Sequence, residues 1–173
     1  RGRRVAAAPP ATGSSAISRE PITLTAPVER ALLVGAPRKG TNARHTVDEH
    51  LDELERLADT AGAVVIGELT QQLDRPHPAT YLGKGKIDEL RLRVEQEQAS
   101  LVIFDDELSP AQARNVEQAV GKRVMDRAEL ILDIFATRAR SSEARMQVEL
   151  AQLQYMLPRL TRMWTHLEKF RGG

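Results

Sequence analysis

Residues 142–170 read SEARMQVELAQLQYMLPRLTRMWTHLEKF, and their large apolar residues recur at alternating intervals of four and three. This a/d heptad spacing predicts one long helix with a continuous apolar stripe, and Pro158 is expected to kink it. Because such a stripe needs a facing helix, we expect residues 141–173 to be the first arm of an antiparallel helical hairpin, ending at a Gly-rich tip. The alternative is that the stripe packs on the chain's own globular part. The stripe consists of Met146, Leu150, Leu153, Leu157, Leu160, Trp164 and Leu167.

The preceding residues, 28–140, alternate short apolar runs with amphipathic stretches. Strands that alternate with helices favour a parallel sheet, because each crossover helix returns the chain to the same end of the sheet. We therefore expect an α/β subdomain with a small four-stranded, mostly parallel sheet and flanking helices. The strands are expected at residues 28–35, 63–69, 101–104 and 123–125, and the helices at residues 46–62, 86–98, 109–120 and 127–140.

Short polar motifs mark where three of these helices are expected to begin. Thr46 with Glu49, and Ser109 with Gln112, fit the capping box, in which the two side chains satisfy each other's backbone amides. Asp126 stands in the corresponding position before the next helix and is expected to cap it.

The remaining composition narrows the class of protein. Residues 1–27 are rich in Ala, Pro, Ser, Thr and Arg without any apolar period, which predicts a disordered basic leader. The chain has no cysteine, which excludes disulfides and thiolate metal sites and fits the reducing cytoplasm. No apolar run approaches the roughly 20 residues of a membrane span, so we expect no membrane partner.

The net charge of +1 conceals an uneven distribution along the chain. Residues 1–27 carry four arginines and one glutamate, and residues 138–173 carry seven basic and three acidic side chains. The remaining residues, 28–137, have a net charge of −6. An acidic body with basic ends suggests that the ends meet a polyanion, although solvated charge on exposed segments is an equal alternative.

Two glycine-rich stretches bear on phosphate binding. Gly35 and Gly40 have the spacing of a phosphate loop, but the Lys-Ser/Thr pair that would contact phosphate and magnesium does not follow them. The run Gly83, Lys84, Gly85, Lys86 precedes a helix, and free amides beside two ammonium groups suit an anion, either a nucleotide or RNA phosphate. A tight turn with solvated lysines is the alternative.

Three acids, Asp105, Asp106 and Glu107, follow the third expected strand and could hold magnesium. We prefer a structural interpretation, because a helix begins directly after them and acids favour a helix N-terminus. The histidines lack a third ligand at metal-binding spacing, so we expect no metal site.

Several short stretches occur together in a fixed order: residues 81–86 (YLGKGK), 104–112 (FDDELSPAQ), 126–127 (DR), 130–136 (LILDIFA), 147–153 (QVELAQL), 164–168 (WTHLE) and 171–173 (RGG). With these stretches, about residues 28–173 resemble the N-terminal domain of the HflX family.

The resemblance implies a role in translation. HflX proteins are GTPases that bind the large (50S) ribosomal subunit and split stalled or idle ribosomes. In this family an α/β subdomain is followed by a hairpin of two long helices, whose tip approaches the peptidyl-transferase centre, and then by a G domain. By this comparison the chain stops at the tip, so GTP and Mg²⁺ belong to the missing G domain. We therefore expect no catalytic residue and no cofactor in this chain.

The expected partners are the large subunit and its 23S rRNA, with no DNA. Two alternatives remain: an ATP-binding α/β domain that uses the loop at residues 83–86, and a dimerisation module. The dimer would pair through Leu150, Leu153, Leu157, Leu160, Trp164 and Leu167. The candidate RNA contacts are Arg159, Arg162, Lys169, Arg171, Gly172 and Gly173, with Arg138, Arg140 and Arg145 near the base of the arm.

Overall fold

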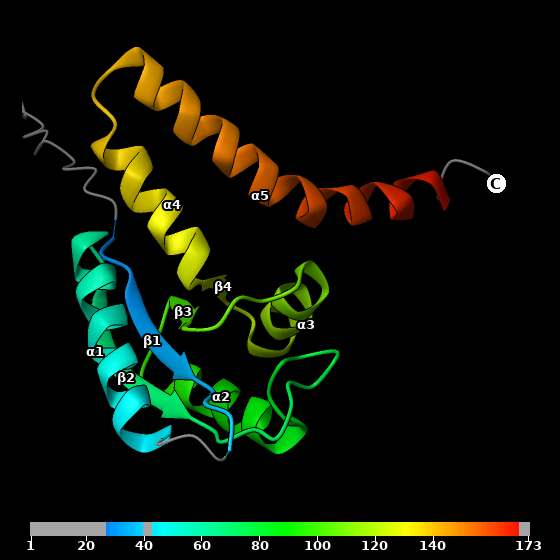
Figure 1. The fold of residues 1–173 in the computed structure, drawn as a ribbon. Coiled ribbons are helices and arrows are strands. Elements are labelled where there is room, and N and C mark those ends of the chain that lie inside the picture. The colour runs from blue at the N-terminus through cyan, green and yellow to red at the C-terminus, as the bar shows by residue number, and fades with distance from the viewer. Residues whose placement is uncertain (1–26, 40–42, 170–173) are drawn as a thin grey trace, which may run out of the picture.

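The computed structural model describes residues 27–39 and 43–169, and side chains within residues 27–39 and 47–159. Strands and helices alternate through the first part of the chain, and a long helix closes it (Figure 1). The elements are β1 (Arg30–Gly35), α1 (Ala43–Thr60), β2 (Val64–Thr70), α2 (Lys84–Gln96), β3 (Leu101–Phe104), α3 (Pro110–Val120), β4 (Arg123–Asp126), α4 (Arg127–Arg138) and α5 (Ser142–Lys169).

The four strands form one sheet in the order β2-β1-β3-β4, and every neighbouring pair is parallel. The expected fold class is therefore confirmed. The central strand β1 is apolar throughout its buried stretch, residues 31–35, as a strand covered on both faces must be.

Helices cover both faces of the sheet and create two separate apolar clusters (Figure 1). Successive β1 side chains point to opposite faces. Leu32 and Val34 pack in the cluster with α2 and α3, whereas Ala31 and Leu33 pack in the cluster with α1 and α4. We call this three-layered unit, from β1 to α4, the body.

The helix boundaries test the capping motifs. Ser109 and Gln112 form the reciprocal capping box at the start of α3, and the Asp126 side chain accepts the Glu129 amide at the start of α4, both as predicted. The prediction that a helix begins at Thr46 is wrong, because α1 already begins at Ala43. Residues 43–45 contain neither Gly nor Pro, so nothing in them stops the helix from extending backwards.

The long helix α5 packs on the body through a different face from the predicted stripe. Val148, Ala151 and Tyr155 are half-buried, whereas the stripe residues Met146, Leu150, Leu153 and Leu157 are 54–64% exposed. Within the described part, the stripe therefore does not pack on the chain's own globular part. The side chains of Leu160, Trp164 and Leu167 lie outside it, and the second arm of the hairpin remains an expectation.

Three further observations concern the chain ends and the arm. The expected leader, residues 1–27, lies outside the described residues except for Pro27. Pro158 lies inside α5, and the ribbon changes direction in the second half of this helix (Figure 1). Among the helices of the described segments, none is both long and apolar enough to cross a membrane.

Candidate functional site

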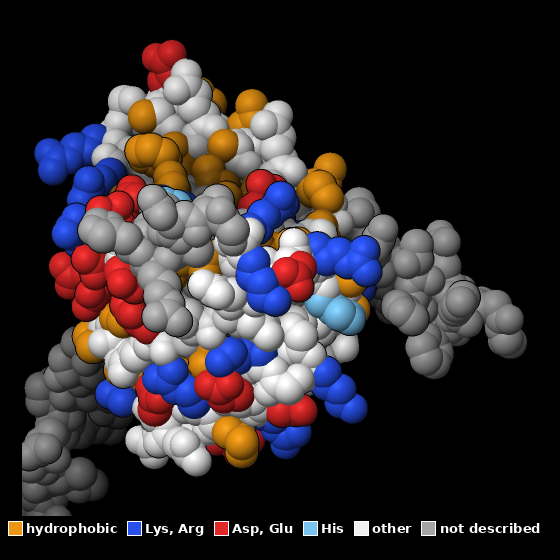
Figure 2. Space-filling model, turned by 60° about the horizontal axis from the view of Figure 1, so that its bottom comes forward, with side chains coloured by type: hydrophobic (Ala, Val, Ile, Leu, Met, Phe, Trp, Pro, Cys, Tyr) orange, Lys and Arg blue, Asp and Glu red, His pale blue; other side chains and the backbone are white. Residues whose placement is uncertain are grey.

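The strand order makes the carboxyl ends of β1 and β3 the first place to look for a site. The chain goes from β1 outward to β2 and then crosses back to β3, and open α/β sheets bind ligands in the crevice at such a switch point. Figure 2 brings this side of the molecule forward. Acidic side chains gather along α1, and in the coloured area basic and acidic side chains are otherwise interspersed.

Asp105, at the end of β3, is engaged by neighbouring side chains. The Arg127 guanidinium donates to its carboxylate at 3.0 Å, and His50 Nδ1 lies 3.3 Å from its other oxygen. Arg127 also donates to Glu53 at 3.2 Å, so one arginine ties the end of β3 to α1. These contacts leave Asp105 committed to the packing of the body.

Asp106 is held in the same way by the loop that precedes α2. It is hydrogen-bonded to the Tyr81 hydroxyl and to the Ala36 backbone, and burial raises the pKa of Asp106. Burial, followed by the charge of Asp106, also raises the pKa of Tyr81. The Tyr81 ring meets Phe104 edge-on at 6.3 Å, and its φ of 65° is in the left-handed region. These contacts favour the structural interpretation of the acids, and no group of three potential metal ligands occurs among the described residues.

The glycine-lysine run opens α2. Gly83 is the N-cap residue, and its amide donates to the Gln71 side chain at 3.2 Å. Lys86 forms an ion pair with Glu89 at 2.8 Å, whereas Lys84 is exposed to solvent. A Cβ added at Gly85 would meet no atom within 4 Å, so no close approach requires glycine there. Anion binding at this helix start stays a prediction.

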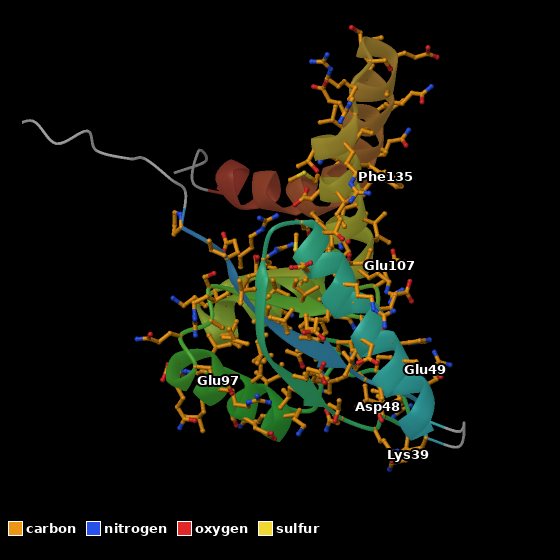
Figure 3. The ribbon with its side chains drawn as sticks, turned by 90° about the vertical axis from the view of Figure 1, so that its left-hand side faces the viewer. Lys39, Asp48, Glu49, Glu97, Glu107 and Phe135 are labelled. Carbon is orange, nitrogen blue, oxygen red and sulfur yellow. The ribbon has the colours of Figure 1, made fainter. Side chains whose placement is uncertain are left out.

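Three exposed arginines lie around the turn between α4 and α5. Arg138, Arg140 and Arg145 are all exposed, and none forms an ion pair with a described residue. The Arg145 guanidinium donates to the Arg140 carbonyl at 3.1 Å. Phe135, near the end of α4, and Met146, in the first turns of α5, are 55% and 64% exposed. We call these five residues the elbow patch; it projects beyond the sheet, with Phe135 on the protruding part of α4 (Figures 1 and 3).

Arg159 is placed differently from the other predicted RNA contacts. Its side chain is only 19% exposed, and its guanidinium forms an ion pair with Asp126 at 3.1 Å. One nitrogen of this guanidinium is therefore engaged within the chain, and the RNA contact of Arg159 stays a prediction. The side chains of Arg162 and Lys169, and all of residues 171–173, lie outside the described part.

The sequence predicted Asp126 as a cap but not as the partner of Arg159. The available signal was the i, i+4 spacing of Tyr155 and Arg159 on the face opposite the stripe, which allows the guanidinium to cover the ring. In the structure the Arg159 Cζ atom lies 3.7 Å from the centroid of the Tyr155 ring.

Two family models match the chain along these elements. The model described as GTP-binding GTPase N-terminal matches residues 48–136, and the one described as GTP-binding GTPase Middle Region matches residues 138–173. The chain is also 48% identical over 145 residues to the GTPase HflX of Flavobacterium psychrophilum. The chain belongs to the HflX family of GTPases. The junction between the two family models falls at the end of α4, where the body gives way to the arm.

Other HflX proteins match the same part of the chain. The GTPase HflX of Escherichia coli is 49% identical over 125 residues, which cover 72% of this chain and 29% of that protein. The Flavobacterium alignment covers 84% of this chain and 35% of the relative, so the chain spans about a third of the HflX proteins it matches. A crystal structure of a GTP-binding protein from Sulfolobus solfataricus in complex with GDP superposes with a TM-score of 0.61 at 28% identity, covering 83% of this chain and 42% of that one.

Proposed function

We propose that this chain is the ribosome-binding N-terminal part of an HflX-type GTPase that splits and rescues ribosomes. In this proposal the arm carries the contact with 23S rRNA in the large subunit, and its tip approaches the peptidyl-transferase centre. GTP and Mg²⁺ act in the G domain of the longer protein. The observation that supports the proposal best is the projecting arm with the exposed arginines Arg138, Arg140 and Arg145 at its base, since folded RNA is recognised largely through its shape and backbone.

The exposed stripe fits the same proposal. Met146, Leu150, Leu153 and Leu157 form an uncovered apolar row on α5. We assign this row to the second helix of the hairpin, supplied by the longer protein. Two paired helices are stiffer than one, and a stiff rod is what a probe of a folded RNA requires.

The test is binding to purified large subunits, measured by co-sedimentation at several salt concentrations. Phosphate contacts release counterions, so affinity falls with salt, by a slope of about 0.7–0.9 per contact. Two triple variants are compared with the natural chain: Arg138→Glu, Arg140→Glu, Arg145→Glu at the elbow patch, and Arg162→Glu, Lys169→Glu, Arg171→Glu toward the tip. We expect each to weaken binding and to reduce the salt slope.

The matched control changes the same amount of charge on the body. Arg56, Arg75 and Lys122 are all exposed, and their triple replacement by glutamate leaves the arm untouched. We expect this control to bind nearly as the natural chain does. If all three variants bound the subunit equally well, the arm would not be the RNA contact.

Self-association through the stripe is a second candidate function, favoured by its exposure in the monomer. Fully burying a large apolar side chain contributes about 1.5–3 kcal/mol, so a few such residues are enough to pair two copies. Analytical ultracentrifugation at several concentrations distinguishes the monomer from the dimer. A concentration-dependent dimer that Leu150→Glu, Leu153→Glu abolishes would support this role, and a monomer at all concentrations would exclude it.

A further inference from the structure

Asp126 is the one charged residue among the described residues that is fully buried, with 1% of its surface exposed. One carboxylate oxygen accepts the Glu129 amide at 3.0 Å, which caps α4. The other accepts the Leu108 amide at 3.0 Å, from the loop after β3. These two bonds fix the carboxylate at the junction of β3, β4 and α4 before the arm is considered.

The arm supplies the countercharge. Arg159 of α5 donates to Asp126 at 3.1 Å and to the Leu108 carbonyl at 3.0 Å. The same guanidinium lies 3.7 Å above the Tyr155 ring and donates to the Tyr155 hydroxyl. Burial, followed by the hydrogen bond and charge of Asp126, raises the pKa of Tyr155. The Nη2 group of Arg159 therefore shares its two hydrogens among three acceptors, which are Asp126, the Leu108 carbonyl and the Tyr155 hydroxyl.

Arg159 contacts the body far from the point where α5 begins. Arg159 lies roughly 25 Å along the helix from Ser142, where α5 leaves the elbow. Between these two points the one polar side-chain contact from α5 to the body in the described part is Gln152 to Asp133 on α4, at 3.4 Å. Together with the apolar packing of Val148 and Ala151, an ion pair this far from the covalent attachment constrains the direction of the helix.

We propose that Arg159 is a positioning residue, which latches α5 to the body through Asp126 and so sets the direction in which the arm projects. An arginine at a buried carboxylate serves this purpose well, because moving the arm away would leave the Asp126 charge buried without a partner. The latch does not depend on the proposed RNA contacts, and it gives the half-buried Arg159 a role within the chain.

The chain lacks cysteine, which allows site-specific spin labelling. Leu92 on α2 and Leu157 on α5 are 56% and 59% exposed, so Leu92→Cys with Leu157→Cys places one label on the body and one on the arm. Pulsed electron–electron double resonance on the full chain then gives the distribution of distances between the two labels. We expect a narrow distribution for the natural chain and a distribution at least twofold broader for Arg159→Met.

Two further variants separate the latch from a general loss of structure. Arg145→Met removes an exposed arginine from the same helix and is expected to keep the narrow distribution. Arg159→Lys keeps the charge without the planar fork and is expected to give an intermediate width. Circular dichroism confirms that each variant retains its helices.

Asp126→Asn tests the other partner, because asparagine still caps α4 but lacks the charge. We expect it to broaden the distribution as Arg159→Met does; if it does not fold, the two Arg159 variants decide. A distribution as narrow in Arg159→Met as in the natural chain would overturn the proposal. The same would hold if Arg159→Met kept the narrow distribution and lost binding to large subunits, since Arg159 would then be an RNA contact.

Discussion

Two leucines on amphipathic helices, one in the body and one on the arm, differ in how far they are buried. Leu54 on α1 has none of its surface exposed, whereas Leu150 on α5 is 56% exposed, although both lie on the apolar face of an amphipathic helix. In the body, each crossover helix lies against the sheet that its strands create. The arm leaves the sheet after α4, and the described part of its apolar face, from Met146 to Leu157, is exposed. Apolar periodicity therefore predicts that a helix has a partner, but not that the partner is in the same domain.

The largest expected loss of unfolding free energy follows from removing the buried charge of Asp126. Asp126→Ala deletes a buried carboxylate that holds Arg159 and two backbone amides, which we expect to cost about 3–5 kcal/mol of unfolding free energy. Asp133→Ala, which removes a half-exposed carboxylate paired with Arg123 at 3.5 Å, is the comparison and is expected to change the unfolding free energy by no more than about 1 kcal/mol. Urea denaturation followed by circular dichroism measures both. A small loss for Asp126→Ala would show that the network contributes little.

Shortening a leucine compares the two regions directly. Leu54→Ala opens a cavity in the body and is expected to destabilise the fold by about 2–5 kcal/mol. Leu150→Ala removes an already exposed side chain, so its effect is expected to stay within about 0.5 kcal/mol. The same urea titrations apply. Similar losses at the two positions would mean that the stripe is covered in solution, and a dependence on protein concentration would identify a second copy as the cover.

The helix caps provide a finer comparison. Ser109 closes the capping box of α3 in the body, and Ser141 accepts the Ala144 amide at 3.1 Å where α5 begins. We expect Ser109→Ala to cost about 1 kcal/mol, because α3 packs on the sheet. We expect Ser141→Ala to cost less, since the first turn of α5 can fray without opening the body. Hydrogen exchange of the first-turn amides in each helix distinguishes unfolding of the whole body from fraying of one helix turn.

The smallest effect concerns pH. Burial raises the pKa of Asp106, so the folded chain holds this proton at a higher pH than the unfolded chain does. The contribution of Asp106 to stability therefore increases as the pH falls through the raised pKa and is absent above it. Asp106→Asn cannot titrate, so the natural chain is expected to gain stability relative to this variant between pH 7 and about pH 4. Glu149→Gln on the arm controls for the loss of one negative charge. A constant difference between natural chain and variant across this range would contradict the assignment.

The body was predictable from sequence because its signals are local. The expected strand at residues 101–104 matches β3 residue for residue, and the cap at Ser109 matches the start of α3. The direction of the arm was not predictable, because it depends on Arg159 meeting a carboxylate 33 residues earlier in the chain. Periodicity identified the stripe, whose described residues Met146 to Leu157 are exposed, but it gave no indication that the opposite face of α5, with Tyr155 and Arg159, packs on the body.

The strand order also fixes a sequence of events during synthesis. β1 is first in the chain but central in the sheet, and its pairing with β3 joins Ala31 to Leu101. A nascent chain therefore cannot complete its central pair until about 70 more residues have been made. Arg159, the countercharge of Asp126, is made 33 residues after Asp126 itself, a delay of roughly 2–7 s at ordinary elongation rates. For that interval the carboxylate remains without its arginine, so the arm can dock on Asp126 only after all four strands of the sheet have been made.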